Sequence, residues 1–297
     1  MSQKGLYKKT IGSGWDHDPD SQRPRENRFF EKAESGKVEK KHKSKAKGKP
    51  RADHKHVYEP VLVWYKGYSS EKIYGCVKKF CPICGRQDSQ SVYAWLKKTE
   101  HKYFGKLKHF FEDKDNNLTP IDENTYRKTI FLGGSTAVDT FALNVKNELI
   151  DILNCGHKLI VGDNTGADLQ LQKLLSENGY ENVVVCYSGA RPRINLGAWK
   201  TKYISVNKYA TGDELQRQKN EQMAQESDEG FILMRGESPT VLATLRRFIA
   251  EQKPCRVVLY DGKKYAGISC ASSWRVETEQ DIEWLLRKIN FISGKRK

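Results

Sequence analysis

The sequence predicts an α/β fold for residues 125–297, a doubly wound and mostly parallel five-stranded sheet with helices on both faces. Two stretches lead to this prediction, TIFLGG at Thr129–Gly134 and LIVGDNTGAD at Leu159–Asp168. Each is an apolar run of strand length that stops at glycines and opens directly into a helical pattern. Further apolar runs alternate with helical patterns down to the C-terminus, which is typical of a parallel sheet.

Residues 1–56 are expected to be a disordered basic leader. They carry 16 Lys and Arg against 8 Asp and Glu, whereas residues 57–128 carry 13 against 9 and residues 129–297 carry 23 against 20. Lys37–Arg51 has almost no apolar side chain to bury, so it cannot offset the entropy cost of ordering. The front-loaded charge predicts a contact with nucleic acid or an anionic surface, and its alternative is a solvated tail.

Residues 57–115 are expected to form a small module of a hairpin and a helix. VLVWY and KIYG are short apolar runs on either side of a glycine-containing turn, as in a hairpin. The segment SVYAWLKKTEHKYFGKLKHFF at 91–111 interleaves aromatic and lysine side chains at helical spacing. Such a helix either stacks on nucleic-acid bases or is an ordinary amphipathic helix with a lysine face.

A structural zinc site is predicted in this module. Cys81-Pro-Ile-Cys84-Gly has the zinc-knuckle spacing that brings two thiolates to one tetrahedral Zn²⁺. The candidate ligands are Cys76, Cys81, Cys84 and His101, with His109 as a second histidine candidate. The alternative is a pair of buried thiols, because the second CxxC pair of a zinc ribbon is lacking. A catalytic zinc is not predicted, since no H-x-E pattern accompanies the cysteines.

The polar segment Asp113–Asn124 is expected to link this module to the α/β half. The strands expected beyond it are Thr129–Leu132, Leu159–Gly162, Val183–Tyr187, Gly230–Met234 and Arg256–Tyr260. The expected helices are Ala137–Leu153, Ala167–Asn178, Asp213–Glu226, Pro239–Gln252 and Glu277–Ile289. Asp261-Gly262 is expected to be a hairpin turn that leads into Lys263–Ser269.

The carboxyl ends of these strands are where an open α/β sheet binds its ligand. Glycines, small polar residues, acids and arginines fall there, and their backbone N–H groups and positive charges suit a phosphate. They are Gly133, Gly134, Ser135, Gly162, Asp163, Asn164, Thr165, Gly166, Asp168, Ser188, Gly189, Arg191, Arg235, Gly236, Glu237, Ser238 and Thr240. Glycine turns are also ordinary connectors, so the pattern predicts a nucleotide site without naming the ligand.

The sequence lacks the motifs of several enzyme classes. It contains neither GxGxxG nor GxxxxGK[ST], so a dinucleotide dehydrogenase or a P-loop ATPase is not indicated and no flavin or nicotinamide is expected. No apolar run approaches the ~20 residues that cross a membrane. The N-terminus lacks a signal-peptide core, so we expect a reducing cytoplasm, in which cysteines are free thiols or metal ligands.

The order of FLGGS, VGDNTGADLQLQKLL, CYSGARPR, QRQKNEQMAQESDEGFILMRGESPTV and PCRVVLY resembles the SLOG superfamily of Rossmann-like domains. That superfamily includes the Lonely Guy phosphoribohydrolases and the DNA-processing protein that loads recombinase on single strands. The likeness covers residues 129–260 and is greatest to small bacterial proteins with GxxxGAD after the second strand and R-N-x-x-M before the fourth. It implies a nucleotide or nucleotide-derived ligand and a homodimer formed through helices that flank the sheet.

The resemblance also assigns roles to residues. It makes Gly133 and Gly134 the first ligand loop, Gly162, Asp163, Gly166, Ala167 and Asp168 the second loop, Arg217, Gln218 and Asn220 a pocket-facing helix, and Gly236 to Thr240 the phosphate loop. The hydrolases carry P-G-G-x-G-T-x-x-E in that last loop, and this chain has Ala243 at the position of the catalytic glutamate. Cleavage by the family's route then requires that Asp163 or Glu237 supply the missing carboxylate.

Three functions remain as hypotheses. The first is binding of a nucleotide or nucleotide-derived ligand, with the basic N-terminal half in contact with nucleic acid. The second is an N-glycosidic hydrolase or transferase that acts on nucleoside monophosphates, and Ala243 argues against it. The third is a platform for single-stranded nucleic acid, which the front-loaded positive charge favours.

Overall fold

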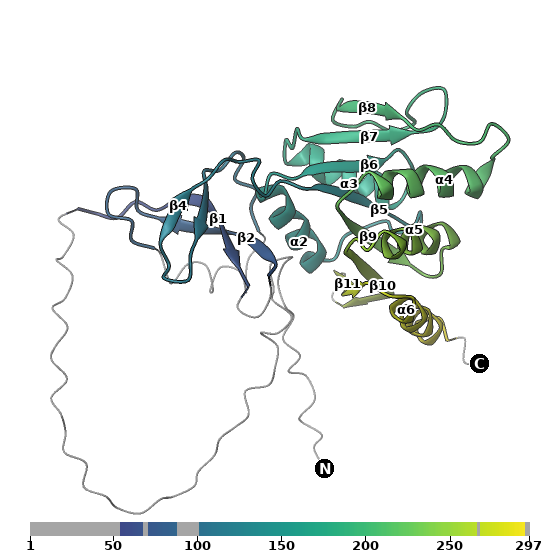
Figure 1. Ribbon diagram of the computed structural model, residues 1–297. Coiled ribbons are helices and arrows are strands. Elements are labelled where there is room, and N and C mark those ends of the chain that lie inside the picture. The colour runs from purple at the N-terminus through teal and green to yellow at the C-terminus, as the bar shows by residue number, and fades with distance from the viewer. Residues whose placement is uncertain (1–53, 68–70, 88–100, 266–267, 295–297) are drawn as a thin grey trace, which may run out of the picture.

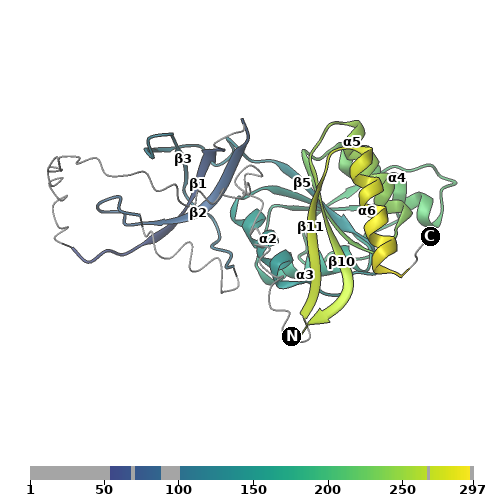
Figure 2. The same cartoon turned by 90° about the horizontal axis from the view of Figure 1, so that it is seen from below.

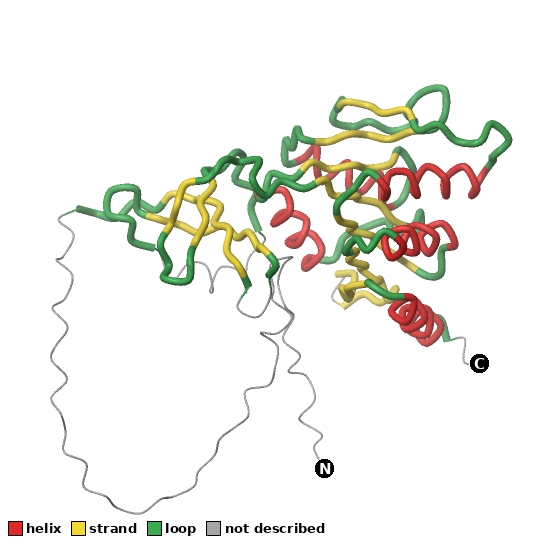
Figure 3. Tube along the Cα trace, in the orientation of Figure 1, coloured by secondary structure: helices red, strands yellow, loops and turns green. Residues whose placement is uncertain are grey.

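The computed structural model of the chain describes residues 54–67, 71–87, 101–265 and 268–294. It contains a small four-stranded sheet and a large seven-stranded sheet (Figures 1 and 3). Most of the expected leader, residues 1–53, lies outside the described residues, as do residues 91–100 of the helix expected over 91–111. Within the described part of the chain, no helix is both long and apolar enough to span a bilayer.

The small sheet has the strand order β2-β1-β3-β4. Its strands are β1 (Glu59–Lys66), β2 (Ile73–Phe80), β3 (His109–Glu112) and β4 (Leu118–Pro120). The antiparallel pairing of β1 with β2 confirms the expected hairpin. β3 lies on the other side of β1 and is parallel to it.

The expected helix is wrong for residues 101–111. These residues contain no helix and end in β3, because their apolar side chains pack into the small sheet. Leu107 lies in the same buried cluster as Leu62 and Trp64, and Trp64 donates its indole N–H to His109 Nδ1 at 3.3 Å. The segment after β3 is a tight turn rather than a linker, since the Asp113 carboxylate accepts the backbone N–H of Asn117 at 2.8 Å.

The large sheet has the order β11-β10-β9-β5-β6-β7-β8. Its strands are β5 (Thr129–Gly134), β6 (Lys158–Gly162), β7 (Val183–Tyr187), β8 (Lys200–Tyr203), β9 (Glu229–Arg235), β10 (Cys255–Tyr265) and β11 (Ile268–Val276). All neighbours from β10 to β8 are parallel, and only β11 is antiparallel to its neighbour. The doubly wound, mostly parallel fold class is therefore confirmed, with seven strands in place of five.

The two strands beyond the expected five lie at the edges of the sheet. β8 is Lys-Thr-Lys-Tyr with every residue exposed, so it has no apolar pattern that marks it as a strand. The expected hairpin turn at Asp261-Gly262 is wrong, because β10 continues to Tyr265 through an irregularity between Tyr260 and Lys264. The returning strand β11 therefore begins later than expected.

Helices cover both faces of the large sheet (Figure 2). They are α2 (Leu143–Asn154), α3 (Ala167–Glu177), α4 (Gly212–Gln225), α5 (Pro239–Ala250) and α6 (Glu279–Ile292). α2 and α3 pack on one face, and α4, α5 and α6 pack on the other. α2 begins at Leu143 rather than Ala137, because the Arg235 guanidinium binds the Ala137 carbonyl and Asp139, each at 3.0 Å, in the segment before it.

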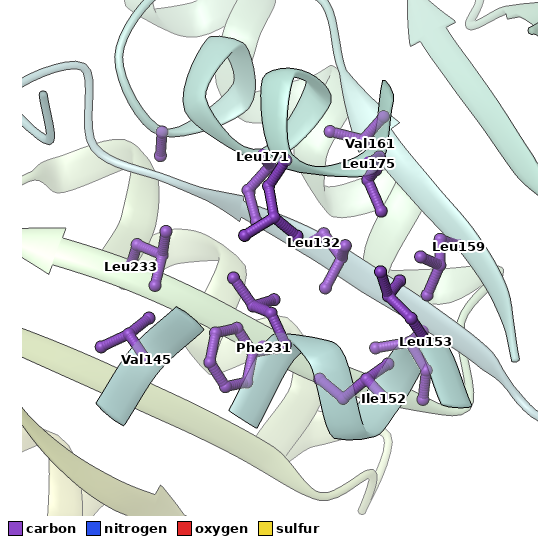
Figure 4. Close-up of a cluster of buried hydrophobic side chains, with 14 of the residues drawn as sticks. Leu132, Val145, Ile152, Leu153, Leu159, Val161, Leu171, Leu175, Phe231 and Leu233 are labelled. Carbon is purple, nitrogen blue, oxygen red and sulfur yellow. The ribbon is translucent and has the colours of Figure 1, made fainter. Parts of the chain in front are cut away.

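Alternating side chains of the central strand β5 supply both cores. Ile130 and Leu132 point to the α2–α3 side, and Phe131 packs on the other side against Phe248 of α5. Figure 4 shows Leu132 among Leu171 and Leu175 of α3 and Phe231 and Leu233 of β9. Such two-sided burial explains the uninterrupted apolar run in the sequence.

The small sheet packs against α2 of the large domain. Leu62, Trp64 and Leu107 form one buried cluster with Cys155, which follows α2. The chain that enters β3 is also tied to the helix by hydrogen bonds, since the His101 N–H donates to Asn147 Oδ1 and the Phe104 N–H donates to Asn154 Oδ1, both at 3.0 Å. The two sheets thus share an interface built on α2.

Candidate functional site

A cluster of two histidines and two cysteines lies at one end of the β1–β2 hairpin. His54, His56, Cys81 and Cys84 place one potential ligand atom each within 4.8 Å of one another, so the cluster can hold a metal ion. The antiparallel register explains the grouping: Glu59 pairs with Phe80, so the residues before β1 lie beside the residues after β2. His54 and His56 are two apart in an extended segment and therefore point to the same side.

The Cys81–Cys84 turn has the geometry that a metal-binding loop needs. The Gly85 N–H donates to the Cys81 carbonyl at 2.8 Å, and Gly85 has φ +67°, which favours glycine. His54 Nε2 lies 3.2 Å from Cys81 Sγ, and His56 Nδ1 lies 3.4 Å from Cys84 Sγ. Hydrogen bonding from His56 is the main cause that lowers the pKa of Cys81 to about 5. A thiolate is the form of cysteine that binds metals.

Two of the four ligands expected from the sequence lie outside this cluster. Cys76 is within β2, five residues before Cys81, and an extended strand separates the two by roughly 16 Å. His101 Nδ1 instead lies 2.8 Å from a carboxylate oxygen of Asp151 on α2. Burial raises the pKa of Asp151, and the bond to His101 opposes that shift.

The sequence analysis did not predict His54 and His56 as ligands, because both fall in the segment that was expected to be a disordered leader. The expected hairpin nevertheless gave a reason to consider them. The expected hairpin, extended by a few residues beyond β1 and β2, places His54-x-His56 opposite Cys81-x-x-Cys84.

A pocket of about 290 Å³ lies at the carboxyl ends of β6 and β7. Its wall consists of Asp163 after β6, of Ser188, Gly189, Arg191 and Arg193 after β7, and of the first turn of α4. The carboxyl edge of a parallel sheet is the expected place for a ligand, and Asp163 and Arg191 are two of the residues predicted there.

Asp163 is the polar centre of this pocket wall. Its Oδ1 lies 2.6 Å from Lys219 Nζ of α4, and the side chains of Lys219 and Asp163 are 0% and 2% exposed. Its carboxylate also accepts the Arg193 backbone N–H at 3.1 Å and the Arg193 Nε–H and Nη2–H at 3.3 Å each. A buried carboxylate is tolerated only when it is paired and hydrogen-bonded in this way.

Asp163 and Asp168 are buried side by side, yet their pKa values shift in opposite directions. Burial alone raises the pKa of Asp163, but the hydrogen bonds from Arg193 and the charge of Lys219 outweigh it and hold the pKa below its usual value. Burial raises the pKa of Asp168 to about 6, and the Asn164 backbone N–H, which donates to its carboxylate at 3.1 Å, offsets only part of that rise. Asp163 therefore loses its proton at a lower pH than Asp168 does.

The two predicted glycine loops lie in direct contact. The Ala167 N–H donates to the Ser135 carbonyl at 3.2 Å, and a Cβ added at Gly166, which has φ +71°, would overlap the Thr136 backbone. Gly162 leaves room for the Asp168 carboxylate in the same manner. The Ser135 Oγ accepts the Arg235 N–H at 3.1 Å, which ties this loop to β9. Ser135 and Gly166 thus serve the close approach of the two loops, whereas Gly134 makes room for the Leu233 backbone of β9 and Gly133 for the Phe131 ring.

The other predicted residues lie away from the pocket wall. Arg217 is on α4 but pairs with Glu214 and Glu221 of the same helix at 2.6 Å each. Asn220 is half-buried on α4, and Thr165 is exposed. In the loop before α5, Gly236 has φ +68°, Glu237 is exposed, the Ser238 Oγ caps the Val241 N–H at 3.5 Å, and the Thr240 carbonyl accepts the Thr244 hydroxyl. That loop belongs to α5 rather than to the pocket.

Lys219 and Arg193 are the site residues that sequence reasoning missed. Lys219 directly precedes Asn220, and the sequence analysis gave a role to Arg217, Gln218 and Asn220 but none to Lys219. Arg193 follows Arg191 and Pro192, and no spacing rule distinguishes one arginine from the other.

Comparison of the chain with protein-family models, with curated proteins and with solved structures finds no match.

Proposed function

We propose that the α/β half of this chain binds a nucleotide or nucleotide-derived ligand in the pocket after β6 and β7. The observation that supports this most is the pocket itself, about 290 Å³ at the carboxyl edge of a parallel sheet, with Arg191 and Arg193 in its wall. Its volume is near the lower limit for small-molecule sites and suits a ligand of nucleoside monophosphate size or smaller. The likeness of residues 129–260 to SLOG domains agrees with this function.

The same contacts favour binding over cleavage of an N-glycosidic bond. A general base needs a free lone pair and a pKa near the working pH. The Asp163 carboxylate already accepts hydrogen bonds from Lys219 and Arg193, and its pKa is lowered. Glu237 is exposed in the loop before α5 and is not part of the pocket wall.

A pocket-filling variant tests the proposed binding. A Cβ at Gly189 would meet only the Arg191 carbonyl, at 3.7 Å, so Gly189→Trp adds a large side chain at the pocket wall without backbone strain. We expect wild-type protein to retain intact nucleotide from a panel of nucleoside mono-, di- and triphosphates, and Gly189→Trp to lose at least tenfold in affinity. Chromatography of bound and free fractions separates intact nucleotide from released base.

Ser176→Trp on the exposed side of α3 is the matched control, and we expect it to bind like wild type. Release of free base would replace the binding function by the N-glycosidic one. Equal affinity of Gly189→Trp and wild type would remove the ligand from this pocket.

We further propose that His54, His56, Cys81 and Cys84 hold a structural Zn²⁺. Two thiolates and two imidazoles are a preferred tetrahedral donor set for zinc, and four protein ligands leave no open position for catalysis. The ion would fix the start of β1 to the end of β2 in a sheet whose buried cluster contains few side chains.

A second candidate function is contact with nucleic acid through the β1–β2 hairpin. Residues 54–87 contain six Lys and Arg against two Glu, which is an excess of four positive charges. At the metal-cluster end of the hairpin, Val57 and Ile83 are 63% and 72% exposed beside the exposed Lys55 and Arg86. Exposed apolar and cationic side chains together suit single-stranded nucleic acid, whose bases and phosphates are both accessible.

A further inference from the structure

Asp163 has two cationic partners that hold it very differently. Lys219 Nζ lies 2.6 Å from Oδ1, and both side chains are buried from solvent. The side chain of Arg193 is 56% exposed, and its Nε and Nη2 atoms reach the carboxylate at 3.3 Å. The short buried bond to Lys219 is therefore the strong one, and the longer exposed bonds from Arg193 are the weaker ones.

The Arg193 side chain can leave Asp163 without leaving a buried charge unpaired. Lys219 still neutralises the carboxylate, and the Arg193 backbone N–H still donates to Oδ2 at 3.1 Å. A guanidinium that leaves is free to bind another anion in the same pocket, because Arg193 is part of its wall.

The charges around the pocket favour an anion such as a phosphate monoester. Arg191, Arg193 and Lys219 lie near two carboxyls, Asp163 in the wall and the buried Asp168, which leaves about one positive charge in excess when both carboxyls are ionised. A phosphate monoester carries about −1.5 to −2 at neutral pH. The first turn of α4 contains two acids, and neither is part of the pocket wall. Glu214 pairs with Arg217 of the same helix, and Asp213 is exposed to solvent.

Backbone donors at the start of α4 complete the site. Gly212 lines the pocket, and the Thr211 side chain makes no capping hydrogen bond to the first turn of this 14-residue helix. Free N–H groups at a helix start favour an anion. The arginines and the helix start approach the same pocket from β7 and from α4.

We propose that Arg193 exchanges Asp163 for the phosphate of the ligand, while Lys219 keeps Asp163 neutralised, so that the pocket selects nucleoside monophosphates over nucleosides. The inference rests on the proposed nucleotide function and names the group that the ligand must carry. Arg193 is then the specificity-determining residue, and Lys219 is a positioning residue.

Calorimetric titration of wild type and Arg193→Gln with AMP, adenosine and ribose 5-phosphate tests the exchange. We expect wild type to bind AMP and ribose 5-phosphate more tightly than adenosine. Arg193→Gln should weaken AMP and ribose 5-phosphate by roughly ten- to a hundredfold, the range for one lost charge-assisted hydrogen bond, and leave adenosine unchanged. The unfolding midpoint of the variant should stay close to that of wild type, because Lys219 still pairs with Asp163.

Arg246→Gln on α5 is the matched control, since Arg246 is 54% exposed and contacts Glu279 at 3.5 Å, away from the pocket wall. The exchange is refuted if wild type binds AMP and adenosine equally, if Arg193→Gln weakens both by the same factor, or if this variant loses stability strongly. In those cases nucleotide binding itself still stands. If wild type binds none of the three compounds, the nucleotide function fails together with the inference.

Discussion

At the scale of single residues, Asp163 and Asp168 show how partners decide the state of a buried carboxyl. Asp163 has Lys219 and Arg193 within hydrogen-bonding distance, whereas Asp168 accepts a backbone N–H from Asn164 and lies near the same cations without contacting them. The first carboxyl ionises below its usual pH, and the second keeps its proton up to about pH 6. One loop therefore contains a fixed negative charge and a group that titrates near neutral pH.

Asp168 should make the stability of the fold depend on pH between about 4 and 6. Its folded pKa of about 6 lies above the ordinary value of 3.8, so the stabilising contribution is complete below the unfolded pKa and is lost as the pH rises through 6. The difference corresponds to roughly 2–3 kcal/mol. We expect the unfolding free energy of wild type, relative to Asp168→Asn, to fall by about that amount from pH 4 to pH 7 in urea titrations.

Asp163→Asn is the opposite case and serves as the comparison. The lowered pKa of Asp163 means that its contribution is present at neutral pH and is lost on acidification. Removal of its charge also strands Lys219, which is fully buried. Parallel pH curves for wild type and Asp168→Asn would contradict the assignment of the titration to Asp168.

The sequence indicated these acids but not their partners. Asp163 and Asp168 follow a buried strand that ends in glycine, which is a local pattern. Lys219 and Arg193 approach from elements 56 and 30 residues further along the chain. Only the packing of α4 and the β7 loop against the end of β6 brings them together, and residue spacing contains no record of that packing.

At the scale of elements, the metal-ligand cluster depends on the pairing of two strands. CxxC is visible in the sequence because both cysteines lie in one turn, whereas the histidines come from the segment before the partner strand. Two of the four ligands are therefore positioned by the register of the β1–β2 pair. The prediction of Cys76 as a ligand treated the hairpin as a compact unit, but β2 keeps Cys76 away along its length.

Substitution of single ligands should separate the observed cluster from the one expected from sequence. We expect elemental analysis to give about one zinc per chain for wild type, a four-ligand site. His56→Asn and Cys84→Ser should each reduce that content to less than half and lower the thermal unfolding midpoint. Cys76→Ser and His101→Asn are the matched controls and should retain the metal, since neither residue is in the cluster. Metal loss in a control but not in His56→Asn would reject the histidine pair.

Edge elements were the hardest part of the large sheet to predict. The central strands are apolar along their whole length because helices cover both faces, so β5, β6, β7 and β9 were found within one or two residues. β8 has no buried side chain, and the continuation of β10 includes a turn-like Asp-Gly pair inside a strand. Backbone pairing with a neighbouring strand holds these stretches in extended form.

At the scale of the whole molecule, the excess positive charge and the α/β fold lie in different parts of the chain. The α/β half is nearly neutral, and the excess of Lys and Arg lies in the first 128 residues. Among the described residues the excess is concentrated in the β1–β2 hairpin, whose sheet packs on α2 on the side away from the pocket of α4. A polyanion bound by the hairpin and a small ligand bound in the pocket would therefore occupy separate surfaces.

Binding of single-stranded DNA should be steeply dependent on salt. We expect the affinity of the full chain for a fluorescently labelled 20-mer of single-stranded DNA, measured by fluorescence anisotropy, to fall as the salt concentration rises. The plot of log affinity against log salt concentration should have a slope of about −0.7 per phosphate contact. Lys55→Gln combined with Arg86→Gln should weaken binding and reduce the slope, because both residues are exposed at the metal-cluster end. Lys173→Gln combined with Lys208→Gln in the α/β half is the control. A slope near zero, or equal effects of the two pairs, would contradict this contact.

The bond between Lys219 and Asp163 also limits how this sequence can diverge. Loss of Asp163 leaves Lys219 as an uncompensated buried charge, at a cost of about 3–5 kcal/mol, which is a large share of the stability of a typical domain. Loss of Lys219 removes the buried cation of Asp163 and leaves its carboxylate to the largely exposed Arg193. The two positions should therefore be inherited as a pair, and descendants of this chain that keep one without the other should be rare.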